Sequence, residues 1–176
     1  MLCCCKSGIF WRFYVKYKTR KHYFDRRQCR GKSLRSIIFD GKRPRGIHAK
    51  RQILIYPATY NDYTENSPFV SVKENGSDYL LTAGKMQDYI DLYARNEEDK
   101  MNPYFAPYIA EDVSNQPDTL ILTCEFDPLR DEGEAYGERL KEAGNHVEIH
   151  RIKDALHGYF ALGIKQLHVQ ERFHLY

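Results

Sequence analysis

Three short blocks of apolar residues have the character of buried strands. Gln52–Tyr56 is an almost continuous apolar run, and Pro57 ends it. Thr119–Glu125 forms a second run of this kind, and His146–Ile152 forms a third. Short continuous apolar runs are typical of parallel strands that are covered on both faces. We therefore predict three strands of a mostly parallel sheet.

Two stretches between these runs show helical spacing instead. Thr82–Asn96 places apolar residues at i, i+4 and i+7, namely Met86, Ile90 and Tyr93. Asp131–Ala143 predicts a second helix, with acidic residues in its first turn that complement the helix dipole. One face of this helix carries Tyr136, Leu140 and Ala143, and Gly144 suits the position just after its end.

The segments that remain carry turn-forming residues. Residues 57–78 are rich in Asn, Ser, Pro, Gly and Tyr and predict a loop. Asn102–Gln116 is irregular, because Pro103 and Pro107 prevent a long helix. The resulting order of strand, long connection, strand, helix and strand indicates an α/β fold, with helices on the faces of the sheet.

Charge divides the chain into two parts. The 176 residues suit one average domain, and 42% hydrophobic with 29% charged residues exclude a wholly disordered or collagen-like chain. The net charge is +3, but it is unevenly distributed. Residues 1–50 contain 15 Lys and Arg and 2 Asp and Glu, whereas the remaining residues contain 12 Lys and Arg and 22 Asp and Glu. We therefore distinguish a basic segment, residues 1–48, from an acidic α/β part, residues 49–176.

The cysteines and the hydropathy predict a cytoplasmic protein. The five cysteines are odd in number, and three of them, Cys3–Cys5, are adjacent and so make poor disulfide partners for one another. No C-x-x-C pair suggests zinc, and no myristoylation or prenylation signal accompanies the cysteine cluster. No apolar run reaches the roughly 18–20 residues of a membrane span, and no signal peptide is visible. A reducing compartment is therefore expected.

Two titratable residues follow predicted strands. Asp127 comes after Thr119–Glu125, and His157 comes after His146–Ile152. If these strands are neighbours, both residues lie at the carboxyl edge of the sheet, where an acid could orient a histidine base. The order acid then histidine matches that of α/β hydrolases. In the alternative interpretation Asp127 is only a turn or helix-capping residue and His157 only a loop residue.

Other polar and aromatic residues have structural interpretations. His146 and His150 lie four apart on a strand rather than on a helix, so they do not predict a zinc motif and are expected at the surface. His168 and His174 suggest no site. Four tyrosines could line an acyl pocket, but packing is the expected role of Tyr56, Tyr60, Tyr63 and Tyr79.

The acidic part resembles the C-terminal half of hormone-sensitive-lipase-like esterases of the α/β-hydrolase fold. The resemblance covers about residues 49–170 and rests on DPLRDEG at residues 127–133, AYGERLKEAG, the LHGY that contains His157, ILIYP and NPYFAPYIAEDVSNQP. It implies that Asp127 is the triad acid and His157 the triad base, while Asp131 and Glu132 are structural. It also implies hydrolysis of short or medium-chain carboxylic esters without a metal or cofactor.

The nucleophile of such an esterase is missing from the chain. The family requires a G-x-S-x-G elbow before Gln52–Tyr56 and an oxyanion-hole loop of the HGGG type further upstream. Neither motif occurs, and Ser7, Ser33 and Ser36 lack the glycines of an elbow. We therefore expect a partial α/β-hydrolase fold that lacks its N-terminal half and is inactive on its own.

The basic segment has two interpretations. Its aromatic and cationic residues could bind nucleic acid or an anionic surface, which would make the chain a non-enzymatic binding protein. Alternatively, synonymous codons CGG CGA CAG TGC CGG GGG AAA TCT TTG encode residues 26–34, and the same bases shifted by one position encode GDSAGGNL, the elbow of the resembled family. Residues 1–48 would then be an out-of-frame translation that is not natively folded, with the serine codon across Gln28 and Cys29. This frameshift hypothesis explains more of the segment.

Overall fold

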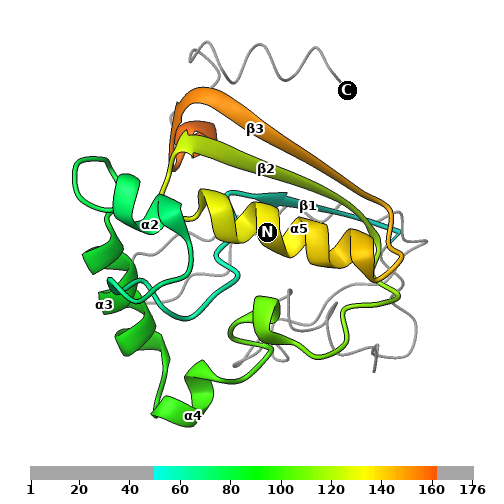
Figure 1. Cartoon of the computed structure of the whole chain (residues 1–176), viewed down its shortest axis with the longest axis horizontal. Coiled ribbons are helices and arrows are strands. Elements are labelled where there is room, and N and C mark those ends of the chain that lie inside the picture. The colour runs from blue at the N-terminus through cyan, green and yellow to red at the C-terminus, as the bar shows by residue number, and fades with distance from the viewer. Residues whose placement is uncertain (1–49, 162–176) are drawn as a thin grey trace, which may run out of the picture.

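The structure is a computed structural model that describes residues 50–161 of the chain. In this part β1 (Arg51–Ile55), β2 (Asp118–Phe126) and β3 (Val147–Leu156) form a parallel sheet in the order β1-β2-β3 (Figure 1). The predicted parallel sheet is confirmed, and β2 lies between the other two strands. Within residues 50–161, β1 pairs with β2 alone.

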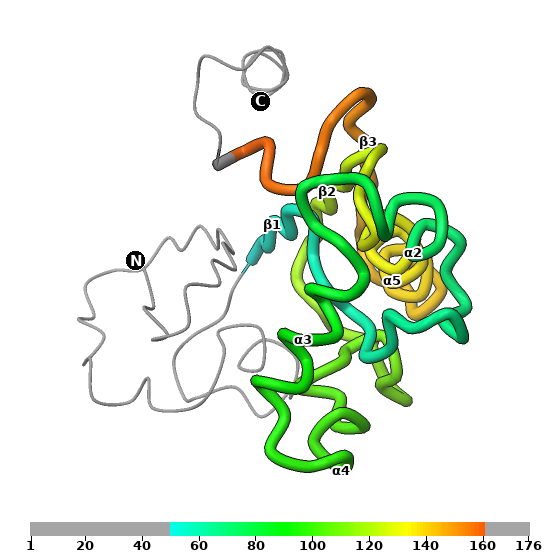
Figure 2. The backbone as a smooth tube through the Cα atoms, turned by 90° about the vertical axis from the view of Figure 1, so that its left-hand side faces the viewer, coloured from blue at the N-terminus to red at the C-terminus, as the bar shows by residue number. Residues whose placement is uncertain are grey.

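Helix α5 (Arg130–Glu142) covers one face of the sheet (Figure 2). Leu54, Ile121 and Ile149 pair in register across the three strands and lie in or against the cluster beneath this helix. Gly137 allows the close approach, because a Cβ atom there would lie 2.6 Å from Cδ1 of Ile149. The predicted helix is therefore confirmed, one residue earlier than expected.

The predicted apolar face and end of α5 are also confirmed. Tyr136 and Leu140 are buried and Ala143 packs against the same cluster. Burial of a leucine of this kind contributes about 1.5–3 kcal/mol relative to an exposed one. Gly144 follows the helix with φ +83°, the left-handed conformation that terminates many helices and that glycine adopts without strain.

The opposite face of the sheet forms a second cluster near the carboxyl ends of the strands. In the described part of the chain, cover on this face comes from the turn η2 (Tyr159–Ala161), whose Tyr159 is buried and whose Phe160 packs alongside. The buried members are Ile55, Tyr56, Leu122, Cys124, Ile152, Ala155 and Tyr159. This cluster lies directly beside the two residues that the sequence analysis placed at the edge of the sheet.

The connection from β1 to β2 forms a third cluster with short helices. It contains α2 (Val70–Glu74), α3 (Ala83–Tyr93), α4 (Glu97–Lys100) and the turn η1 (Pro107–Ile109). Its buried members include Tyr63, Phe69, Val72, Leu81, Met86, Ile90 and Leu129. Since Leu129 directly precedes α5, this cluster packs the connection against the start of that helix.

Helix α2 corrects the prediction of a loop over residues 57–78. The five residues Val70–Glu74 are helical although Phe69, at the N-cap, offers no side-chain hydrogen bond to the helix. Instead the hydroxyl of Ser71 donates to the carbonyl of Pro128 at 2.8 Å. The helix is thus stabilised by contacts with a distant segment, which local sequence patterns do not record.

Helix α3 is confirmed, but one of its expected core residues is wrong. Thr82 caps the helix, accepting a hydrogen bond from the Lys85 N–H at 3.2 Å. Met86 and Ile90 are buried as predicted, whereas Tyr93 is 64% exposed in the last turn, with its ring tilted by 47° against that of Phe105. The helix ends at Tyr93, so the third position of the predicted stripe no longer faces the core.

Strand β3 extends further than predicted and removes most of the expected loop before His157. The β2–β3 pairing becomes irregular between Cys124 and Phe126, and Asp154 adopts φ +55° at this bulge. The N–H of Asp154 donates to the carboxylate of Glu125 at 2.8 Å. Pairing then resumes up to Leu156, because the bulge absorbs the extra residues.

Several sequence-based expectations lie outside the described residues. These are the basic segment with Cys3–Cys5 and Cys29, the out-of-frame hypothesis, and the histidines near the C-terminal end, His168 and His174. Within residues 50–161, no helix is long and apolar enough to cross a membrane.

Candidate active site

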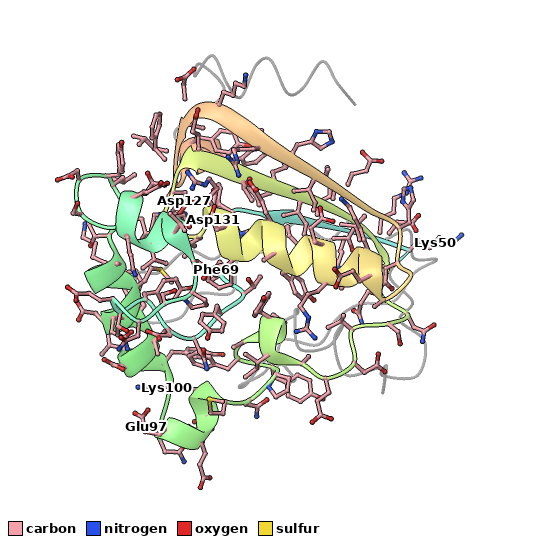
Figure 3. All side chains as sticks on the ribbon, viewed as in Figure 1. Lys50, Phe69, Glu97, Lys100, Asp127 and Asp131 are labelled. Carbon is pink, nitrogen blue, oxygen red and sulfur yellow. The ribbon has the colours of Figure 1, made fainter. Side chains whose placement is uncertain are left out.

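Asp127 and His157 lie together at the carboxyl edge of the sheet. Asp127 follows β2 and His157 follows β3, and these strands are parallel neighbours. Nδ1 of His157 is 2.8 Å from Oδ2 of Asp127. Figure 3 shows Asp127 at the end of the sheet opposite Lys50, where the strands begin. The predicted proximity of the acid and the imidazole is therefore confirmed.

Asp127 uses its two carboxylate oxygens for different contacts. Oδ1 accepts a hydrogen bond from the N–H of Leu129 at 2.9 Å and so closes the turn into α5. Oδ2 contacts His157. Oδ1 thus has the role of a turn residue, as in the alternative interpretation, while Oδ2 is available for the imidazole. Only 1% of the Asp127 side-chain surface is exposed.

The contact fixes which nitrogen of His157 carries a proton. An ionised carboxylate only accepts hydrogen bonds, so Nδ1 is the donor toward Asp127. In the neutral imidazole Nε2 is then the nitrogen with a free lone pair. The pair can therefore accept a proton at Nε2 and stabilise the resulting imidazolium through the carboxylate.

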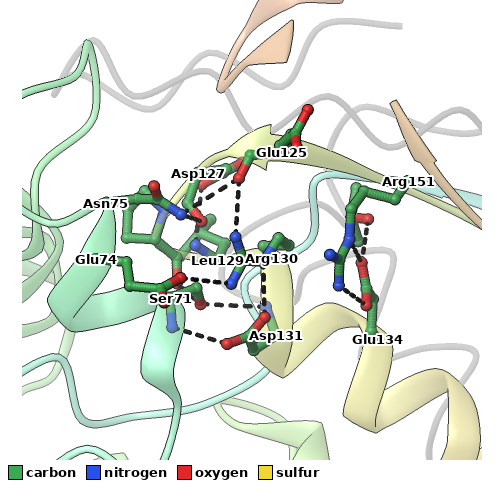
Figure 4. Close-up of polar contacts among 12 residues, drawn as sticks. Ser71, Glu74, Asn75, Glu125, Asp127, Leu129, Arg130, Asp131, Glu134 and Arg151 are labelled. Carbon is green, nitrogen blue, oxygen red and sulfur yellow. Dashed lines mark hydrogen bonds and ion pairs between the residues drawn. The ribbon is translucent and has the colours of Figure 1, made fainter. Parts of the chain in front are cut away.

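The turn that carries Asp127 is bonded to α2. The N–H of Ser71 donates to the Asp131 carboxylate at 2.7 Å, and the N–H of Asp131 donates to the Ser71 hydroxyl at 3.2 Å (Figure 4). Asn75 donates to the main-chain carbonyls of Glu125 and Asp127 at 3.3 and 3.4 Å. Residues from the β1–β2 connection therefore hold the main chain on both sides of the acid.

Arg130 joins the same network of contacts. Its guanidinium donates to Glu74 at 3.0 Å, to Asp131 at 2.7 Å and to the carbonyl of Glu125 at 3.1 Å. Burial opposes ionisation of Asp131, but the hydrogen bonds from Arg130 and from the Ser71 N–H outweigh it. The pKa of Asp131 therefore lies below its ordinary value. Arg130 and Asp131 remain a charged pair beside the turn.

Glu132 attaches α5 to the segment that follows β1. Its buried carboxylate accepts hydrogen bonds from the N–H of Thr59 at 2.6 Å and from the hydroxyl of Tyr63 at 2.9 Å. The Thr59 hydroxyl also donates to the Glu132 carbonyl at 3.0 Å. These contacts agree with the structural role that the sequence analysis gave to Asp131 and Glu132.

Tyr56 is the aromatic neighbour of His157. The centroids of the two rings are 4.5 Å apart, and the ring planes are tilted by 56°. The sequence pattern predicts a packing role for this tyrosine and gives no sign of its contact with the histidine. Ser71 and Asn75 were also missed, because nothing in a loop-like composition distinguishes residues that contact a distant turn.

No cysteine nucleophile or metal cluster accompanies the pair in the described part of the chain. Cys124 is fully buried, and burial together with the nearby Asp127 charge raises the pKa of its thiol far above the ordinary value, so it stays protonated. Residues 50–161 contain no group of three or more His, Cys, Asp or Glu arranged to hold a metal. His150 lies beside Glu148 with 39% of its side chain exposed, as expected for a surface histidine.

The chain matches a known family over most of its length. Residues 36–161 match the family described as alpha/beta hydrolase fold. An arylesterase from Saccharolobus solfataricus is 38% identical over 109 residues, which are 61% of this chain and 34% of that protein. An ethyl acetate hydrolase from Pseudomonas putida is 36% identical over 112 residues, 64% of this chain and 34% of that protein. The chain thus spans about a third of these curated relatives.

Solved structures of esterases are also similar to this chain. A thermostable esterase from Pseudomonas putida superimposes with a TM-score of 0.66 at 30% identity, covering 73% of this chain and 40% of that one. A hyperthermophilic esterase from Pyrobaculum calidifontis gives a TM-score of 0.65 at 36% identity, covering 70% of this chain and 40% of that one.

Proposed function

The chain belongs to the α/β-hydrolase fold family of esterases, and from this premise we propose that it is part of a serine carboxylic ester hydrolase. In this proposal Asp127 is the triad acid and His157 the general base. The observation that carries it is the 2.8 Å contact between Nδ1 of His157 and Oδ2 of Asp127, across neighbouring parallel strands. The relatives named above are esterases, which favours a small carboxylic ester as substrate.

The proposed reaction uses the free nitrogen of His157. Nε2 takes the proton of a serine hydroxyl as that oxygen attacks the ester carbonyl, and Asp127 stabilises the imidazolium. The imidazolium then gives the proton to the departing alcohol, which leaves an acyl-serine. Nε2 next takes a proton from water, and the hydroxide attacks the acyl group. The proton then returns to the serine as the carboxylic acid product departs.

We infer that the serine is encoded at this locus but not translated in its own frame. Residues 26–34 can be encoded by codons that spell GDSAGGNL when they are read one base later. This segment precedes β1 in the chain, and the resembled family has its elbow in the corresponding place. The family match begins at residue 36, directly after this string. Because this match is made in the translated frame and already includes residues 36–48, we place the change of frame close to residue 35, and the proposed out-of-frame translation is the part before it.

The nucleotide sequence of codons 15–50 tests this inference. The expected result is that the shifted frame spells G-D-S-A-G-G across codons 26–32, with a single insertion or deletion before codon 50. Codons that spell another sequence in that frame would overturn the inference. The Asp127–His157 pair would stand, because it depends on no residue of the basic segment.

An assay of the chain as printed tests the missing nucleophile. Because the acyl-enzyme route needs the serine, we expect no hydrolysis of p-nitrophenyl acetate above the uncatalysed rate. Turnover that disappears in His157→Ala would show that the chain holds a nucleophile elsewhere. Turnover that survives in His157→Ala would contradict the assignment of the base. The earlier alternative of a nucleic-acid-binding protein has no support from the relatives named above.

A further inference from the structure

The main chain at Tyr56 has an unusual conformation for a large side chain. Tyr56 directly follows β1 and has φ +37°, in the left-handed region that favours glycine. It is nevertheless held firmly, since its N–H donates to the carbonyl of Leu122 at 2.6 Å and the residue is only 6% exposed. Strained conformations of this kind persist only where surrounding contacts enforce them, and they are concentrated at functional sites.

The segment after Tyr56 shows what enforces the conformation. Pro57 packs beside Gly133 of α5, where a Cβ atom would lie 3.5 Å from the proline ring. Two residues further on, Thr59 bonds to Glu132 through both its N–H and its hydroxyl. The chain therefore turns from the sheet onto the first turn of α5 within a few residues.

The side chain of Tyr56 belongs to the cluster on the face of the sheet opposite α5 and contacts His157. Its ring is 4.5 Å from the imidazole and 6.0 Å from the ring of Tyr159, which it meets edge to face at 74°. His157 is thus contacted by Asp127, from the turn after β2, and by Tyr56, from the end of β1.

We propose that Tyr56 is a positioning residue for His157, an inference that rests on the proposed function of that histidine. One hydrogen bond leaves an imidazole free to rotate about the line between donor and acceptor. The tyrosine ring removes that freedom and keeps Nδ1 directed at Asp127. Its π face also favours the imidazolium that forms when Nε2 takes a proton. Tyr56 acts through the histidine ring that it contacts.

The Nδ1 proton of His157 provides a direct test in the full 176-residue chain. A proton held between imidazole and carboxylate gives a low-field NMR resonance, which ¹⁵N-histidine labelling detects and His157→Gln assigns by its loss. We expect the resonance in the unsubstituted chain and in Tyr56→Phe, which keeps the ring. In Tyr56→Leu we expect it to broaden or disappear, with proton exchange at least about tenfold faster because the ring opens more often.

Tyr136→Leu is the matched control. Tyr136 is a buried tyrosine too, but it lies on α5 in the cluster on the other face of the sheet. It should keep the resonance while losing comparable stability. If Tyr136→Leu and Tyr56→Leu lose the resonance equally, or if Tyr56→Leu keeps it with unchanged exchange, the inference is overturned.

Two further outcomes keep the test decisive. If Tyr56→Leu does not fold, Tyr56→Asn replaces it, because asparagine tolerates positive φ and lacks an aromatic ring. The same two results then support or overturn the role of Tyr56. A missing resonance in the unsubstituted chain would instead contradict the Asp127–His157 pair and hence the proposed function, which separates the two failures.

Discussion

Asp127 and His157 differ in how many groups contact them and in how far along the chain those groups lie from each residue. Asp127 exposes 1% of its side chain and His157 exposes 19%. The acid is held by the Leu129 N–H, and its main chain is bonded to Arg130 and Asn75. The histidine has the acid and the ring of Tyr56.

This difference teaches that Asp127 is preorganised and that the orientation of His157 depends on it. The turn of Asp127 has its own hydrogen bonds, which do not involve the histidine. His157 lies between β3 and η2, where Gly158 takes φ +87°. Changes on the acid side should therefore reduce global stability, whereas changes on the histidine side should alter local order with smaller losses.

The largest expected loss is that of Glu132→Ala. The substitution leaves the Thr59 N–H and the Tyr63 hydroxyl without the carboxylate they bond to, and it empties a fully buried position. We expect about 3 kcal/mol lower free energy of unfolding in urea. Glu138→Ala on the exposed side of the same helix should cost less than about 0.5 kcal/mol. Equal losses in the two variants would refute the role given to Glu132.

Asn75→Ala tests the link between α2 and the turn of the acid. Its two donated hydrogen bonds are long, at 3.3 and 3.4 Å, so a loss of about 1–2 kcal/mol is expected. Hydrogen exchange at residues 127–130 should accelerate more than exchange in β1. The exposed Asn66→Ala serves as control and should be neutral in both measurements. A uniform acceleration over the sheet would mean that Asn75 stabilises the fold generally and not the turn.

Gly158→Ala tests whether the turn directly after His157 affects the orientation of the imidazole. Both Gly158 and Gly144 have positive φ and room for a Cβ atom, which would meet nothing at Gly144 and only Cδ2 of Leu80, at 3.9 Å, at Gly158. Alanine should therefore cost about 1 kcal/mol at either position. Only Gly158→Ala should change the NMR signals of the His157 ring, because Gly144 lies at the far end of α5. Identical ring signals in both variants would show that the turn after His157 does not influence its orientation.

The smallest expected effect concerns acid pH. The folded-state pKa of Asp131 is lowered, since Arg130 and the Ser71 N–H outweigh burial. Its contribution to stability is therefore fully present above the unfolded value of about 4 and is lost as the pH falls through the folded pKa. Urea midpoints at pH 6 and pH 3 should differ less in Asp131→Asn than in the unsubstituted chain. An equal or larger difference in Asp131→Asn would contradict the sign.

The sequence was sufficient for the features that local patterns encode. Apolar runs predicted the three strands, and helical spacing predicted α3 and α5. The rule that chemistry lies at the carboxyl ends of parallel strands predicted that Asp127 and His157 lie together, as they do. Their catalytic roles stay a prediction, as does the cytoplasmic location.

Long-range contacts explain what was missed. Helix α2 has no capping side chain and is held by Pro128 and Asp131. The extra length of β3 depends on a bulge opposite Glu125, and the role of Tyr56 depends on the sign of one φ angle. Each of these features arises when two distant segments meet, so no single window of sequence contains it.

The most direct test of the Asp127–His157 pair is the esterase activity of the protein expressed with the family frame restored ahead of residue 36. Any coding sequence that precedes this segment is included. On p-nitrophenyl acetate, we expect His157→Ala to lower kcat by about 10⁴-fold or more and Asp127→Asn to lower it by about 10⁴-fold. Both variants should remain folded, with unchanged signals in the cluster beneath α5. Activity within a few fold of the unsubstituted protein in either variant would contradict the account.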